Sequence, residues 1–184
     1  MEIDLNELRD KAYKCACDHG FHEKEISDET YLMLIITEIS EAVNADRKNH
    51  HAYLEEFNKI CTVTDFGFIA KFEGYIKDSI EDEISDVVIR LLDFAGARGI
   101  DFEKDDILGC DNNFCGDDSF CEKCYYLCRL AADNFSYSKL EQTIKVLLAD
   151  IYQLSKRYNI ELFKFIDLKM KYNELRPYKN GKNY

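Results

Sequence analysis

Two pairs of acidic residues, each set inside an apolar stretch, constrain this chain more than any other feature. Glu38 and Glu41 lie three residues apart in ITEISEAVNADRKN, and Glu83 and Asp86 have the same spacing in EDEISDVVIRLLDFAG. Residues three apart share one face of a helix, so each pair presents two carboxylates side by side. Repulsion and lost hydration make this arrangement costly beside a core unless a positive charge lies between the carboxylates. The sequence therefore predicts two helices that face each other across a cation.

Carboxylate oxygens from two facing helices are hard ligands, which favour Mg²⁺ or Mn²⁺, particularly where substrate phosphates complete the coordination shell. The expected metal ligands are Glu38, Glu41, Glu83 and Asp86. The alternative is that these pairs lie on solvated helix faces. The stretch before Glu38 is apolar on all sides, which argues against that alternative, and the second pair continues to Arg90 and Asp93 along one line beside an apolar stripe.

The apolar periodicity predicts an all-α protein with a four-helix core and additional C-terminal helices. The chain has 184 residues and a single proline, Pro177, so almost all of it is free to be helical. Helices are expected at 6–17, 28–48, 75–98, 119–134, 138–158 and 161–174. Residues 49–75 are expected to connect two of them through short helical pieces that leave 66–68 irregular, and 101–118 to form an acidic loop.

We expect one domain over residues 1–184. Residues 1–100 would carry the metal-bearing helices, 119–174 a second helical hairpin and a last helix, and 175–184 a basic tail. The second hairpin aligns weakly with the first, so that the four ligand positions become Leu127, Leu130, Thr143 and Val146. A degenerate repeat and a chance match of two helical patterns both explain this alignment.

The net charge of −12 argues against a nucleic-acid backbone as the main partner, because such binders usually carry a basic face. No stretch reaches the ~20 apolar residues of a membrane span. The first residues, MEIDLNELRDKAYK, show no basic start followed by an apolar block, so we expect a cytoplasmic protein.

Five of the eight cysteines lie between residues 110 and 128. The Cys121-x-x-Cys124 pair resembles half of a zinc site, but Cys110 and Cys115 lack the matching spacing. Cys121, Cys124 and Cys128 also follow helical spacing, which suits small apolar residues of a core. We therefore expect structural cysteines without zinc or a disulfide, with a zinc site as the alternative.

Together these motifs resemble the all-α nucleotide pyrophosphohydrolases, namely the MazG-like enzymes and their dimeric dUTPase relatives. The resemblance covers the E-x-x-E and E-x-x-D pairs, the run from Glu41 to Lys48, and a tail pattern formed by Lys171, Asn173 and 176–182. The stretch between the pairs is longer than in the family, and the Cys-rich insert at 101–125 is a further departure. The resemblance implies Mg²⁺-dependent hydrolysis of a nucleoside triphosphate to a monophosphate and pyrophosphate, as in cleansing of the nucleotide pool.

The reaction that the resemblance implies needs particular groups, and the chain offers candidates for each. Glu38 or Glu41 would deprotonate the attacking water. The candidates for binding phosphates are Lys48, Arg90, Arg176, Lys179 and Lys182, each of which could instead be a surface cation. The candidates for holding the base are His19, Phe21 and His22, or these form only a loop after the first helix. The base and sugar are not identified by the sequence, and a homo-oligomer is possible.

Two other functions fit the same residues. Within the family, phosphoribosyl-ATP pyrophosphohydrolase is less favoured because of the extra helices and the long connection. Outside it, a non-catalytic helical protein could use the acidic pairs to bind a structural cation or a partner.

Overall fold

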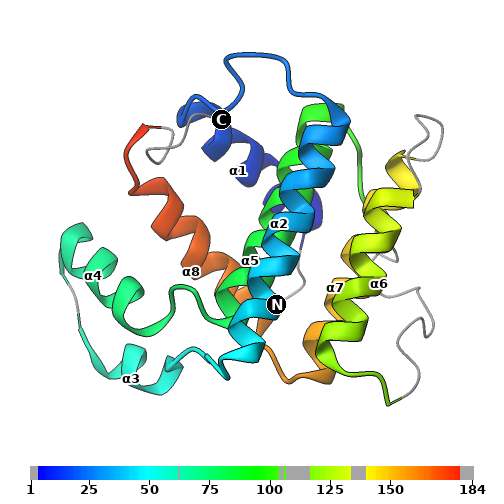
Figure 1. The fold of residues 1–184 in the computed structure, drawn as a ribbon. Coiled ribbons are helices and arrows are strands. Elements are labelled where there is room, and N and C mark those ends of the chain that lie inside the picture. The colour runs from blue at the N-terminus through cyan, green and yellow to red at the C-terminus, as the bar shows by residue number, and fades with distance from the viewer. Residues whose placement is uncertain (1–3, 62, 104–105, 107–116, 134–139, 179–184) are drawn as a thin grey trace.

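In the computed structural model of this chain, the described residues are 4–61, 63–103, 106, 117–133 and 140–178. Within these ranges the regular structure is helical and no strand occurs (Figure 1), which confirms the all-α class. The helices are α1 (Leu5–Asp18), α2 (Asp28–Arg47), α3 (Leu54–Lys59), α4 (Asp65–Tyr75), α5 (Ile80–Arg98), α6 (Phe120–Asp133), α7 (Leu140–Arg157) and α8 (Leu162–Glu174).

The two helices that carry the acidic pairs, α2 and α5, form the centre of the molecule. Figure 1 shows α6 and α7 on one side of this pair and α1 and α8 on the other, with α3 and α4 extending from the lower end. Helix α5 packs against α1, α2, α7 and α8, and α2 also packs against α6. One continuous apolar cluster runs through all of these helices, so α5 is held from several directions.

Local sequence signals set the limits of the two central helices. Ser27 caps α2 by accepting a hydrogen bond from the backbone N–H of Thr30. Ser79 caps α5 in the same way through the N–H of Asp82, and Gly99 ends α5 in the left-handed conformation at φ 64°. The apolar stripe expected along α5 is buried, including Ile84, Val87, Val88, Leu91 and Leu92.

The connection between α2 and α5 differs from the sequence-based expectation. Residues 66–68, expected to be irregular, lie inside α4, whose first turn is capped by Thr64. The helix expected to begin near residue 75 begins at Ile80, because Asp78 takes a positive φ of 62° and Ser79 then starts a new helix. Two separate helices, α3 and α4, therefore form the connection for which the sequence indicated short helical pieces and an irregular 66–68.

Helix α1 reaches α5 at a point where only a small residue fits. A Cβ atom on Gly96 would lie 2.6 Å from the Cβ of Tyr13. The side-chain amide of Asn6 exchanges two 2.9 Å hydrogen bonds with the backbone of Phe102, just beyond α5. These contacts fix α1 along α5, on the side of α5 away from α7.

The second hairpin packs on the first, with α6 against α2 and α7 against α5. At the positions aligned with the ligands, Leu127 and Thr143 are buried, and Leu130 and Val146 are half-buried. These side chains extend the core, and the interpretation of the hairpin as a degenerate repeat stays a prediction.

The cysteine expectation is confirmed in part. Cys124 is buried and Cys128 half-buried in α6, but Cys121 is exposed. Cys110 and Cys115 lie outside the described residues. Among the helices that the structure describes, none is long and apolar enough to cross a membrane.

Candidate metal centre

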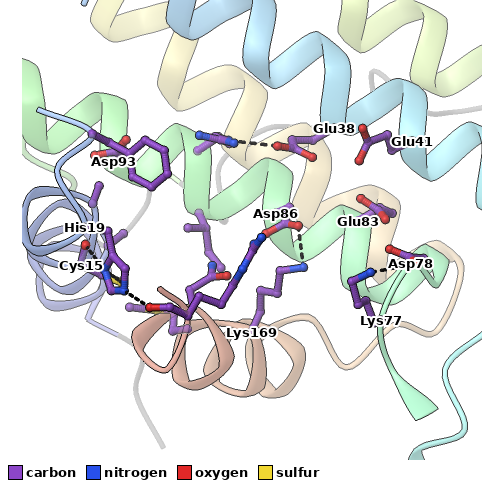
Figure 2. Close-up of a pocket in the computed structure, with 18 residues that line it drawn as sticks. Cys15, His19, Glu38, Glu41, Lys77, Asp78, Glu83, Asp86, Asp93 and Lys169 are labelled. Carbon is purple, nitrogen blue, oxygen red and sulfur yellow. Dashed lines mark hydrogen bonds and ion pairs between the residues drawn. The ribbon is translucent and has the colours of Figure 1, made fainter. Parts of the chain in front are cut away.

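Three of the four expected ligands meet between α2 and α5. Oxygen atoms of Glu38, Glu83 and Asp86 lie within 4.8 Å of one another, close enough to share one cation. Figure 2 shows Glu38 and Glu41 pointing from α2 toward Glu83 and Asp86 on α5. Glu41 lines the same cavity but is not part of the close cluster, and it is exposed.

The carboxylates line a cavity of about 270 Å³ that continues along α5 toward the end of α1. Its walls come from α1, α2, α5 and α8, together with Lys77 and Asp78 before α5. No described residue of α6 or α7 lines it. The second hairpin therefore packs against α2 and α5 outside the cavity, and α1 and α8 supply the wall that faces the carboxylates.

Burial makes the acidic cluster electrostatically costly. Glu83 is 6% exposed, and within the described chain its side chain has no hydrogen-bond or ion-pair partner. Burial, followed by repulsion from Asp86 and Asp82, raises its pKa to about 9. Burial and the Asp86 charge also raise the pKa of Glu38, although Arg90 opposes that shift. A cation between these groups would relieve the repulsion.

A buried lysine from α8 neutralises one edge of the cluster. The ammonium of Lys169 lies 2.8 Å from Asp82 Oδ1 and 2.7 Å from Asp86 Oδ2, and the lysine is 5% exposed. Burial alone would lower its pKa, but the charges of Asp86 and Asp82 outweigh burial and raise it. Lys169 is therefore a fixed positive charge in the wall of the cavity.

The hydrogen-bond pattern leaves particular oxygen atoms available to a metal ion. Glu38 uses Oε1 for Arg90 Nε at 3.0 Å, and Asp86 uses Oδ2 for Lys169. The other oxygen of each carboxylate has no partner among the described residues, and neither does Glu83. Asp82 differs, because Lys169 and the N–H of Asp78 occupy both of its oxygens. This donor set of hard oxygens fits Mg²⁺ or Mn²⁺.

The residues proposed for phosphates divide into two groups. Arg90 and Arg176 line the cavity. Lys48 does not: it is the exposed C-cap of α2. It lies seven residues, or ~10 Å along the axis, beyond Glu41. Lys48 is therefore not among the residues that line the cavity, and its phosphate-binding role stays a prediction. Lys179 and Lys182 lie outside the described residues.

The residues proposed for the base lie at the far end of the cavity. His19 and Phe21 line it. Both ring nitrogens of His19 contact backbone oxygens, Nδ1 that of Cys15 at 2.8 Å and Nε2 that of Arg176 at 3.1 Å. His19 thus joins the end of α1 to the residues after α8 and brings Arg176 to the cavity.

His22 does not line the cavity and instead supports a residue that does. Its Nε2 lies 2.7 Å from Oδ1 of Asp93, and its Nδ1 lies 3.2 Å from the hydroxyl of Tyr31. Asp93 is buried on α5 and lines the cavity. His22 therefore acts on the cavity through Asp93 and has no direct contact with it.

Sequence reasoning missed Lys169 and Lys77 as cavity cations. A lysine at a core position of α8, with Phe165, Ile166, Met170 and Tyr172 buried around it, is the signal that could have indicated Lys169, because a buried lysine needs an acidic partner. Lys77 lies in the short connection before α5, which the sequence assigned to a helix, so the direction of the Lys77 side chain was not predictable.

Comparisons with protein-family models, with curated proteins and with solved structures found no match to this chain. The functional argument therefore rests on the residues and their geometry.

Replacement of Glu83 by glutamine should stabilise the metal-free protein at neutral and alkaline pH. Below about pH 4.5, the ordinary pKa, both folded and unfolded states hold the proton. As pH rises toward 9 the unfolded state releases it more readily, so the free energy of unfolding falls across this range. Glu83→Gln should remove this decline and raise the free energy of unfolding at pH 8 by on the order of 3 kcal/mol, because each unit of pKa shift is worth about 1.4 kcal/mol and the glutamine amide is itself buried.

The measurement is urea denaturation in EDTA from pH 5 to 9. Glu55→Gln, at an exposed residue of α3, is the control and should follow the wild-type curve. If the free energy of unfolding depends on pH equally in wild type and Glu83→Gln, Glu83 is not the group whose raised pKa destabilises the metal-free protein.

Replacement of Lys169 by methionine should be strongly destabilising, because it leaves Asp82 and Asp86 without their shared cation. Breaking a buried pair by removing one partner costs about 3–5 kcal/mol. Lys164→Met, at an exposed residue of α8 paired only with Glu161, should change the free energy of unfolding by less than ~1 kcal/mol. Similar denaturation midpoints for the two variants would contradict the role given to Lys169.

Proposed function

We propose that this protein is a Mg²⁺-dependent nucleoside triphosphate pyrophosphohydrolase of the all-α, MazG-like type, which releases a nucleoside monophosphate and pyrophosphate. The observation that carries the proposal is the convergence of Glu38, Glu83 and Asp86 within 4.8 Å, from two helices, in a cavity that also contains basic side chains. The sequence resemblance names the same residues as metal ligands.

The charges of the cavity support a metal-dependent reaction on a phosphorylated substrate. Acidic side chains outnumber basic ones along its walls, so a triphosphate without a cation would be repelled. A bound divalent ion would neutralise the phosphates and polarise the attacked phosphorus. Arg90, Lys169 and Arg176 lie on the walls, where positive charge can bind phosphate oxygens.

Glu41 is the best candidate for the general base. It lines the cavity, is exposed, and has no partner among the described residues, whereas Glu38 is already paired with Arg90. Glu41 would take a proton from the attacking water while the water oxygen forms a bond to the α-phosphorus. The bond between the α-phosphorus and the oxygen that bridges to the β-phosphate then breaks. Pyrophosphate then leaves with the electrons of that bond.

The experiment is incubation of the purified protein with each ribo- and deoxyribonucleoside triphosphate and Mg²⁺, with separate assays for pyrophosphate and orthophosphate. We expect pyrophosphate and a monophosphate in equal amounts, and no turnover in EDTA. Release of orthophosphate would contradict the proposed reaction. Mg²⁺ binding without turnover of any nucleotide would favour the non-catalytic cation-binding alternative.

The matched variants are Glu41→Gln and Glu29→Gln, both at exposed glutamates of α2. Loss of a general base typically costs 10²–10⁴-fold in rate, so Glu41→Gln should lose about that much kcat and keep the thermal stability of the wild type. Glu29→Gln, at the remote end of the helix, should keep both. Near-normal kcat in Glu41→Gln would exclude Glu41 as the base.

A further inference from the structure

One buried carboxylate of the cavity has no place in the metal chemistry. Asp93 is 6% exposed and lies on α5. Its Oδ1 accepts a 2.7 Å hydrogen bond from His22 Nε2, while Oδ2 has no partner among the described residues. Asp93 lines the cavity, so a bound molecule can reach the carboxylate there. A buried acceptor with an open position of this kind indicates a ligand.

The orientation of this carboxylate is fixed by its neighbours. Because Asp93 accepts from Nε2, that nitrogen carries the hydrogen, and in the neutral imidazole Nδ1 of His22 accepts from the Tyr31 hydroxyl at 3.2 Å. The Tyr13 ring packs edge to face with the imidazole, with ring centroids 4.7 Å apart. Tyr31 is itself stacked on Phe94 at 4.3 Å. This shell holds Oδ1 in place and leaves Oδ2 for another donor.

The position of Asp93 matches the far end of a nucleotide. It follows Asp86 by seven residues on the same helix, which is ~10 Å along the axis, and Figure 2 shows it at the end of the cavity away from Glu83. Arg90 lies between the two ends. If the acidic cluster holds the phosphates, the sugar or base extends toward Asp93. Apolar residues line the cavity as well, namely Ala16, Phe21, Ile89 and Met170.

We propose that Asp93 accepts a hydrogen bond from an N–H or O–H group of the nucleoside and so determines which nucleotides this protein binds. The inference rests on the proposed function for the placement of the phosphates. The donor is an amino group of the base or a hydroxyl of the sugar, and both present the same chemistry to Oδ2. His22 is a positioning residue, since it acts only through Asp93.

A carboxylate at this position discriminates strongly between nucleosides that present a hydrogen-bond donor to it and those that do not. An ionised acceptor repels a nucleoside that presents only acceptors there, and a ligand without a donor leaves the buried oxygen unpaired. Sites built to bind a polar group reject analogues lacking it far more strongly than apolar pockets reject a change in size. The discrimination should therefore be about tenfold or more.

The test compares wild type with Asp93→Asn, which keeps the shape and the acceptor for His22 but turns an amide NH₂ toward the ligand. With the triphosphate that the wild type prefers, we expect kcat/KM to fall at least about tenfold, mainly through KM. Asp167→Asn, at an exposed residue of α8, is the control and should match the wild type.

Substrate analogues identify the donor. One arm uses base analogues without the amino group (purine in place of adenine, 2-pyrimidinone in place of cytosine), and the other uses 2′,3′-dideoxy sugars. The deletion that weakens the wild type about tenfold but leaves Asp93→Asn unaffected marks the group that Asp93 binds. If each analogue is discriminated equally by wild type and variant, Asp93 is structural and the inference is wrong, while the hydrolysis stands.

Binding measurements separate this inference from the proposed activity. Calorimetric titration with the nucleoside monophosphates needs no turnover, so it applies even if no triphosphate is hydrolysed. Weaker binding of at least one monophosphate to Asp93→Asn, by about tenfold, would support the inference without the reaction. Equal binding to wild type and variant, or no binding to either, would overturn it.

Discussion

The ion pairs of Lys169 with Asp82 and Asp86 hold the two sides of the cavity together. Lys169 comes from α8, and both carboxylates come from the first turns of α5. A buried ammonium must be paired, and Asp82 and Asp86 are the carboxylates that pair with it. This requirement fixes α8 against α5 at the level of the metal ligands, and Arg176, which follows α8, is brought to the cavity wall with it.

The remaining carboxylates carry an electrostatic cost that Lys169 relieves only in part. Glu38 is paired with Arg90, and Glu83 has no ion-pair partner among the described residues. Burial and the neighbouring carboxylates raise the pKa of Glu83 to about 9, so its carboxyl group holds a proton at neutral pH in the metal-free protein. A divalent ion would exchange that proton for a stronger positive charge, which makes metal binding depend on pH. Buried, mutually repelling carboxylates with raised pKa values, within an otherwise well-packed pair of helices, are typical of a functional site.

The sequence predicted most of the helices and the acidic side of the site, but not the wall that faces it. Helical periodicity indicated the central and C-terminal helices, and the three-residue spacing placed Glu38 opposite Glu83 and Asp86. Spacing defines faces of a helix but not which other helix covers them. The wall formed by α1 and α8 was therefore not predictable, and neither was the fact that Lys48 does not line the cavity. Asp93 was visible as part of the acidic line of α5, but its contact with His22 depends on tertiary packing.

The central claim is that the facing carboxylates of α2 and α5 share a divalent cation. Diffraction from crystals soaked in Mn²⁺, with data at the manganese absorption edge, tests it most directly. The account predicts an anomalous peak between Glu38, Glu83 and Asp86, with Lys169 still bound to Asp82. Crystals that bind Mn²⁺ elsewhere, or not at all between these carboxylates, would contradict it.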